Sequence, residues 1–455
     1  MAKLGGLGKN FRKVWSAPSR QPPIMCVIMT IDLQTRKTLR IIILTTCFGV
    51  LGRLIFNNGF MLTYLSRLGF PSYRILFLLS LVPLAGLVLT LPFAYLSDRF
   101  GKKRIGIGGT ITALFGLLLL TSAGFFQEQG GRVAIAGILI FSIGSSAIAS
   151  NWFALLSPII PEDIRGRFFG KLRISWQTTG IVFTLAVTTL LGLFTQIQFF
   201  QCVLLFVLIC SMIRIYLYWR IPELETTRTP PRGLLAPFLE ILRIPGYLPF
   251  CAYTFLLMLF AGAVPWVLGL LGKDVLFFSD TQILLLGNSG AAGAVAGFYI
   301  GGKMVDQLGT KPVFLICHFC FAMVLFLTAL RGLFPFPDIV TMCLLSGLFG
   351  VAFAASGIAF SSELLAIIQP ENKSLSTGFH LSLVSAGIAI SSLIIGQTLK
   401  LNILNPEWTL MGQTLCTYDT VLLGSAVMIL LLIITLGLIP SVIQVRKAQW
   451  YPQNR

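Results

Sequence analysis

A basic residue with amide neighbours lies inside the first long apolar segment of the chain. Arg53 follows Arg40 by 13 residues, a helical rise of ~20 Å, and Asn57 lies one turn further on, with Asn58 beside it. A guanidinium group with amide neighbours suits a carboxylate or phosphate. An unpaired arginine at membrane depth costs at least ~2.5 kcal/mol, so Arg53 is expected to face a cavity or a partner. The alternative is that Arg53 joins parts of the protein through backbone carbonyls.

Two titratable side chains are candidates for carrying a proton. Glu363 is the only acidic residue well inside an apolar segment, and His380 in the next segment can titrate near neutral pH. A salt bridge at the membrane rim is the alternative role for Glu363, and a structural role is the alternative for His380. Cys317 and Cys320 with His318 favour packing over metal binding, so no metal site is predicted.

Four further side chains at membrane depth are weaker candidates for contact with a solute. Two are tryptophans, for which anchoring at the membrane interface is the alternative. The four are Trp152, Gln177, Trp266 and Asn288.

The composition shows which elements must position these residues. Of 455 residues, 56% are hydrophobic and 11% are charged, whereas soluble domains carry ~25% charged residues. Lipid is therefore the expected solvent, and each segment of ~20 apolar residues must be helical to satisfy its own backbone. Twelve such segments lie near 41–64, 74–97, 105–126, 133–156, 174–196, 199–219, 247–271, 282–304, 312–333, 338–365, 376–399 and 420–444.

The segments predict an all-α membrane protein with five parts. These are a cytoplasmic basic N-terminal arm at 1–40, a six-helix bundle at 41–219, a cytoplasmic linker at 220–246, a second six-helix bundle at 247–444 and a cytoplasmic tail at 445–455. The linker includes a short amphipathic piece. The apolar stretch 23–31 is too short for a signal peptide and no cleavage site follows it.

The net charge of +18 follows the topology and does not indicate nucleic acid. With the N-terminus inside, 26 of the 34 basic residues lie in inner segments and 6 in outer loops, while Arg53 and Arg214 lie within helices. This is the positive-inside pattern, so both termini are predicted to be cytoplasmic. Short loops favour the plasma membrane of a bacterium, its inner membrane.

An internal repeat supports the division into six plus six helices. Asp98-Arg99-Phe-Gly101-Lys102 after the second segment is matched 208 positions later by Asp306-Gln-Leu-Gly309, with Lys311 following. Pro161-Glu162 after the fourth segment is matched 209 positions later by Pro370-Glu371. Parallel repeats of this kind are a known transporter architecture.

The repeated loops resemble the signature of the major facilitator superfamily over about residues 40–445. That signature is Gly-x-x-x-Asp-Arg-x-Gly-Arg/Lys-Arg/Lys; Ala94 replaces the first glycine here, and the second copy keeps Gly302 but has Gln307 in place of the arginine. The loop 161–170 is also similar to the family's loop between helices 4 and 5. The resemblance implies two pseudo-symmetric six-helix bundles that alternate access to one cavity, with helix 1 lining it.

The inner loops are the expected gates. Gly101 and Gly309 permit sharp turns, and Asp98 and Asp306 can accept hydrogen bonds from helix N-termini of the other half when the inner side is shut. The alternative is that the basic residues only fix the topology. The predicted gating residues are Asp98, Arg99, Gly101, Lys102, Glu162, Arg165, Gly302, Asp306, Gly309, Lys311 and Glu371.

These observations predict a secondary transporter that moves a small solute, with an anion favoured by Arg53. Coupling stays open between proton symport through Glu363 or His380 and facilitated diffusion. No clustered His, Asp and Cys set indicates an enzyme, no nucleotide-binding loop indicates an ATP-driven pump, and no cofactor is expected. The chain is expected to be a monomer. A non-transporting membrane sensor or assembly factor on the same fold is the alternative.

Overall fold

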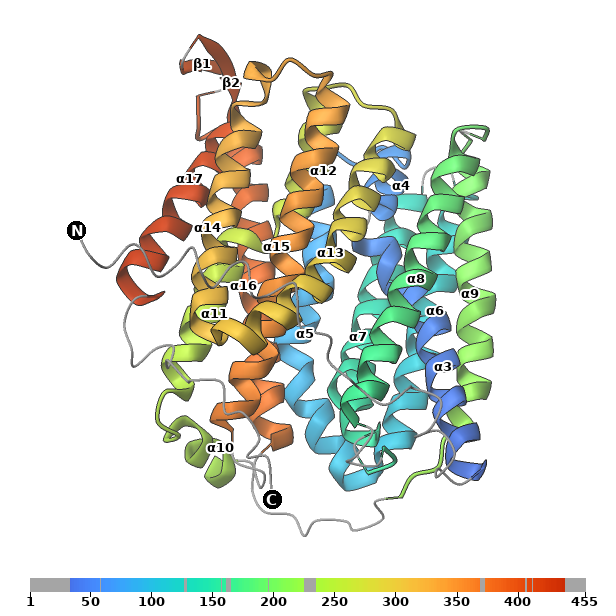
Figure 1. Ribbon diagram of the computed structural model, residues 1–455. Coiled ribbons are helices and arrows are strands. Elements are labelled where there is room, and N and C mark those ends of the chain that lie inside the picture. Colours follow the sequence, from blue (N-terminus) through green and yellow to red (C-terminus); the bar gives the residue numbers. More distant parts are fainter. Residues whose placement is uncertain are drawn as a thin grey trace, which may run out of the picture.

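The computed structural model describes residues 33–57, 59–126, 129–156, 158–160, 165–194, 196–224, 235–368, 373–405, 407–410 and 412–437. Within these residues, twelve helical segments are long and apolar enough to cross a membrane. They run roughly parallel, with the first half at the right of Figure 1 and the second half at the left. The predicted all-α membrane fold of twelve spanning segments is confirmed.

The first half consists of α3 (Leu33–Asn57) with α4 (Phe60–Arg67), α5 (Ser72–Phe100), α6 (Lys102–Ala123), α7 (Gly130–Leu156), α8 (Arg165–Leu191) and α9 (Ile197–Trp219). The second half consists of α11 (Tyr247–Ala261) with α12 (Val264–Asp274), α13 (Asp280–Leu308), α14 (Thr310–Ala329), α15 (Asp338–Ile367), α16 (Lys373–Leu401) and α17 (Thr417–Leu432), which continues as a short π-helical segment, Ile433–Gly437. Between them, α10 (Leu235–Leu242) is the amphipathic piece expected in the linker. α3 begins eight residues before the predicted span because its polar first turns can extend into water.

The first and seventh spanning segments are each interrupted, which the apolar patterns did not predict. Gly59 adopts a left-handed conformation with φ of 86° between α3 and α4. Pro265, at the start of α12, separates that helix from α11. Interrupted helices at membrane depth are tolerated only where protein or a water-filled cavity surrounds the freed backbone groups. Both breaks lie against the other half, because a Cβ at Gly59 would meet Ile283 of α13 and Trp266, beside Pro265, bonds to the backbone of Phe56 in α3.

The halves meet along two lines of contact, α5 against α16 and α8 against α13. Within each half, glycine allows helix backbones to touch. A Cβ at Gly350 of α15 would lie 2.0 Å from the carbonyl oxygen of Gly290 in α13, and one at Gly144 of α7 would lie 2.4 Å from that of Gly109 in α6. Small residues are the usual means of close helix packing in lipid.

Gly350→Ala is expected to destabilise the fold by about 1–3 kcal/mol, because the new methyl group meets rigid backbone. Gly357→Ala in the same helix is the matched control, since a Cβ there has no heavy atom within 4 Å. The control is expected to be neutral or slightly stabilising. Thermal unfolding of both purified variants measures the difference, and equal midpoints would contradict the prediction.

A small β-hairpin adds to the predicted helices. β1 (Glu407–Leu410) pairs antiparallel with β2 (Gln413–Cys416), and Gly412, with φ of 77°, helps to close the turn between them. The hairpin lies in the loop between α16 and α17, at the top of Figure 1. Its position marks the end of the bundle that the charge pattern predicts to be outside.

Candidate functional site

The inner turn of the first half is held by Glu223, which is not among the predicted gating residues. Gly101 between α5 and α6 has φ of 105°, a conformation strained for any other residue. The backbone N–H of Lys103 donates to the Glu223 carboxylate over 3.3 Å. Glu223 follows α9, 120 positions along the chain, and its charge suits the positive N-terminal end of α6. The spacing in sequence gave no sign of this contact.

The inner turn of the second half has a related arrangement. Gly309 has φ of 82°, and Thr310 at the start of α14 donates its hydroxyl proton to Glu363 of α15 over 2.6 Å. Glu363 is 1% exposed, and its other carboxylate oxygen has no hydrogen-bond partner among the described residues. Glu363 thus binds the hydroxyl of the first residue of a helix in its own half, while its other carboxylate oxygen is buried without a partner among the described residues.

The remaining predicted gating residues are dispersed around these turns. Asp98, Arg99 and Asp306 are exposed, and Asp306 makes no hydrogen bond or ion pair within the described part of the chain. Lys102 begins α6, Gly302 lies in α13, Arg165 begins α8 and Lys311 is buried. Glu162 and Glu371 lie outside the described residues. Their gating roles stay predictions.

The opposite, outer ends of the two halves are joined by an ion pair. Arg67 at the end of α4 donates through Nε to Asp280 at the start of α13 over 2.7 Å, and its Nη2 lies 2.5 Å from the same oxygen. The two residues are 213 positions apart. Both appeared in the sequence only as loop or helix-end charges, so this pairing required the tertiary structure.

Three of the predicted solute contacts also join the two halves. Trp266 in α12 donates its indole N–H to the backbone carbonyl of Phe56 in α3, 3.1 Å away. Asn288 in α13 donates to the hydroxyl of Thr188 in α8 over 2.8 Å. Gln177 in α8 donates to the carbonyl of Ala291 in α13 over 3.3 Å. These side chains are therefore used, in this conformation, for contact between halves.

Arg53 lies four residues before the end of α3, near the middle of the spanning segment that α3 and α4 form together, and its side chain is exposed. It forms no hydrogen bond or ion pair with any described residue, so the backbone-carbonyl contacts of a structural arginine are not seen. Asn57 ends the same helix and is also exposed, whereas Asn58 lies outside the described residues. Trp152 differs from these because it is 8% exposed and packs on Tyr218, with 5.4 Å between ring centroids.

The two histidines both lie beside Phe360 in the second half, with ring centroids 5.8 Å from that of Phe360 for His318 and 6.5 Å for His380. His380 is 5% exposed, stacks on Phe250 and has no hydrogen-bond partner for either ring nitrogen among the described residues. His318 instead joins Tyr253, at 2.6 Å, to Ser356, at 2.9 Å. His318 is therefore part of a buried polar network with Tyr253 and Ser356. Separately, the described residues contain no cluster of three or more potential metal ligands.

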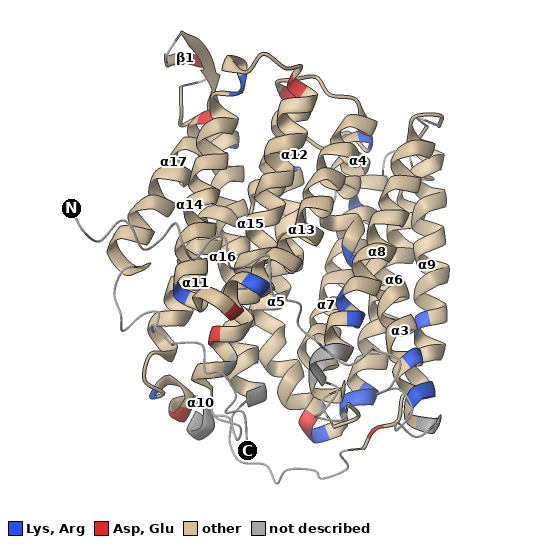
Figure 2. Cartoon of the chain, viewed as in Figure 1, with Lys and Arg blue, Asp and Glu red and all other residues tan. Residues whose placement is uncertain are grey.

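The distribution of charge and the helix count fit one large family of transporters. Figure 2 shows most basic residues near the ends of the helices opposite the hairpin, and few charges in the middle of the bundle. The sequence model of the major facilitator superfamily matches residues 42–392, which is most of the chain. The chain belongs to the major facilitator superfamily.

Two relatives of this superfamily member are transport proteins of fungi. It is 26% identical to the MFS transporter asaE of Aspergillus flavus over 346 residues, covering 72% of this chain and 70% of that protein. It is 29% identical over 125 residues to the fujikurins efflux protein of Gibberella fujikuroi, covering 27% of this chain and 23% of that protein. The predicted bacterial origin therefore has no support from these relatives.

Solved structures of transporters share the fold. The nucleoside transporter NupG superposes with a TM-score of 0.63 at 15% identity, covering 89% of this chain and 98% of that chain. A POT family transporter in complex with 5-aminolevulinic acid gives a TM-score of 0.70 at 13% identity, covering 89% and 96%. Identities this low show the fold alone. Family and fold together indicate a secondary transporter and not an enzyme.

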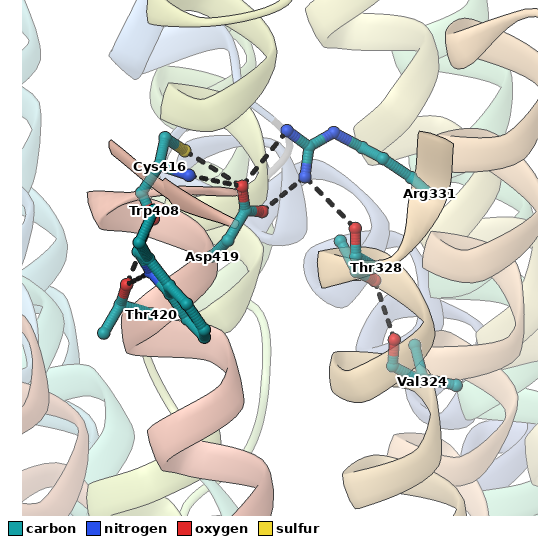
Figure 3. Close-up of polar contacts among 7 residues, drawn as sticks. All are labelled: Val324, Thr328, Arg331, Trp408, Cys416, Asp419 and Thr420. Atoms are coloured by element: carbon teal, nitrogen blue, oxygen red, sulfur yellow. Dashed lines mark hydrogen bonds and ion pairs between the residues drawn. The ribbon is translucent and has the colours of Figure 1, made fainter. Parts of the chain in front are cut away.

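This superfamily member also contains a buried ion pair near the outer end of the second half (Figure 3). Both guanidinium Nη atoms of Arg331, which follows α14, donate to the carboxylate of Asp419 in the first turn of α17. Asp419 is fully buried and also accepts from the backbone N–H of Cys416, 3.0 Å away. Beside it, the indole of Trp408 from the hairpin donates to Thr420 over 2.7 Å. The pair therefore fastens α17 and the hairpin to the end of α14.

Proposed function

We propose that this protein moves a small anionic solute across the membrane by alternating access. Arg53 carries the proposal, because it is an exposed cation near the middle of the spanning segment that α3 and α4 form, with no hydrogen-bond or ion-pair partner among the described residues. A guanidinium at that depth is costly unless it serves a cavity or a ligand. A carboxylate or phosphate on the solute would supply the missing bidentate partner.

The described contacts between halves suggest an outward-closed state. The ion pair Arg67–Asp280 and the bond from Trp266 to the backbone of Phe56 lie near the outer ends. At the inner ends, Asp306 is exposed without a hydrogen bond or ion pair among the described residues, and Glu223 and Glu363 bind the first residues of helices within their own halves. The proposed cycle breaks the outer contacts when the solute site turns outward.

Uptake into proteoliposomes tests the proposal. The purified chain should give saturable flux of at least some members of a panel of small organic anions, measured in both directions with and without a pH gradient. Flux of neutral or cationic solutes alone would contradict the anionic assignment. The complete absence of flux across all three groups would favour the alternative, a sensor or assembly factor that has kept the fold.

Reversing the charge of Arg67 is expected to favour outward opening. In Arg67→Asp two carboxylates face each other where an ion pair stood. The pair is partly exposed, with side chains 45% and 19% accessible. Its contribution to the stability of the outward-closed state is therefore about 1 kcal/mol, which corresponds to roughly a fivefold shift in the conformational equilibrium. Both proteins are prepared in a cysteine-free background that carries Phe56→Cys. The new cysteine should react several-fold faster with an impermeant thiol reagent added outside in Arg67→Asp than in the protein that keeps Arg67.

Adding Asp280→Arg to Arg67→Asp should return this labelling rate towards the starting value, because the ion pair is restored with its charges exchanged. An equal labelling rate in the starting protein and the Arg67→Asp variant would show that the contact does not hold the outer side closed.

Glu363 is one candidate for proton coupling, because one of its oxygens is buried without a partner among the described residues while the other is bound to Thr310. Glu363→Gln keeps an acceptor for the threonine but cannot bind and release a proton. We expect solute accumulation driven by a pH gradient to fall to the level without the gradient, while exchange of solute persists. Glu240→Gln, at an exposed acid of α10, is the matched control. Unchanged accumulation in Glu363→Gln would rule out this role.

A further inference from the structure

A second arginine lies within the membrane-spanning part of the first half, against the backbone of α3. Arg214 comes from α9, and a Cβ at Gly49 of α3 would be 2.5 Å from its guanidinium carbon. The guanidinium also lies 6.0 Å from the ring centroid of Trp152 in α7. Glycine at position 49 thus leaves the space in which the charged end of Arg214 lies, between three helices.

Arg53 lies one helical turn after Gly49 on nearly the same face of α3. Side chains in an α-helix lean towards the N-terminus, so a residue covers the surface of the preceding turn. The side chain of Arg53 therefore leans towards the place where Arg214 meets Gly49.

No carboxylate among the described residues neutralises either arginine. Neither forms an ion pair, and the Nε of Arg214 is buried without a hydrogen-bond partner. The polar neighbour Tyr218 donates its hydroxyl to Asn151 over 3.3 Å and so offers no negative charge. Two like charges at this depth repel each other, and a bound anion is the simplest group that would stabilise both.

We propose that Arg53 and Arg214 together bind the oxyanion group, a carboxylate or a phosphate, of the solute, over the glycine face of α3. The physiological role of this two-arginine site rests on the proposed transport function, but its ligand chemistry can be tested by binding alone. Each guanidinium can offer two parallel N–H donors to one oxyanion, a geometry that a chloride ion cannot use.

The test measures binding to the purified full-length chain in detergent. Thermal unfolding is followed during titration with inorganic phosphate and, separately, with succinate, while sodium chloride keeps the ionic strength constant. A saturable rise in Tm is expected with at least one of the two oxyanions and not with chloride. Arg53→Gln and Arg214→Gln should each raise the apparent Kd at least tenfold.

Glycine variants provide a test that keeps both arginines. Gly49→Ala introduces a methyl group that must displace the guanidinium of Arg214, and it should raise the apparent Kd several-fold without unfolding the protein, because the displaced group is the end of a flexible side chain. Gly52→Ala in the same helix is the matched control, since its Cβ would meet Phe141 at an ordinary 3.5 Å. The control should bind within twofold of the starting protein.

The outcomes separate this inference from the proposed function. Saturable anion flux combined with unchanged binding and flux in Arg214→Gln and Gly49→Ala would overturn the two-arginine site and leave transport standing. Oxyanion binding that depends on Arg214 and Gly49, without flux of any solute, would support the site and refute transport. No rise in Tm with either oxyanion would overturn the site. Should Arg214→Gln fail to fold, Gly49→Ala against Gly52→Ala decides the question.

Discussion

Asp419→Ala is expected to lower the free energy of unfolding by about 3–5 kcal/mol, because it leaves Arg331 buried without its counter-ion. Arg331 is 8% exposed and Asp419 is fully buried, so water cannot replace the lost carboxylate. The carboxylate also binds the N–H of Cys416 at the start of α17. The same change therefore removes a helix cap, which by itself is worth ~1 kcal/mol.

Thermal or denaturant unfolding of the purified chain measures this effect. Asp338→Ala is the control, because Asp338 occupies the first turn of α15 in the same way but is exposed. Its loss should cost only ~0.3–1 kcal/mol. The double change Arg331→Met with Asp419→Leu should recover most of the lost stability, since it removes both charges together. A loss below about 1 kcal/mol in Asp419→Ala would mean that the pair does not fasten α17.

Arg53→Ala is expected to reduce solute flux roughly tenfold to a hundredfold, because the change removes one or two charge-assisted hydrogen bonds to the solute. The fold should remain intact, because Arg53 makes no contact with a described residue that its removal would leave unpaired. Initial rates in proteoliposomes and the unfolding midpoint in detergent separate transport from stability.

Two further variants sharpen this prediction. Arg53→Lys keeps the charge but not the paired donors, and should retain flux between those of the starting protein and Arg53→Ala. Arg132→Ala removes an exposed arginine near the start of α7 and should transport normally. Normal flux in Arg53→Ala would refute the binding role of Arg53.

Most of the fold could be predicted from the sequence because its cause is local. Lipid requires each spanning segment to satisfy its own backbone, so about twenty consecutive apolar residues specify a helix without reference to the rest of the chain. The repeated loops at Asp98 and Asp306 then identified two halves, and Gly101 and Gly309 between successive helices do adopt the positive φ that a sharp turn requires. The break at Gly59 was missed because hydropathy does not report backbone conformation.

The candidate site was only partly predictable, for a different physical reason. The depth of Arg53 and Glu363 follows from counting residues along a helix, so the sequence by itself selected them. Their surroundings depend on which helices pack together. Three contacts join residues more than a hundred positions apart: Glu223 at the N-terminus of α6, Asp280 beside Arg67, and Arg214 against Gly49. A charge in a linear sequence carries no information about its partner, so only the tertiary structure decided which arginines have a partner among the described residues and which have none.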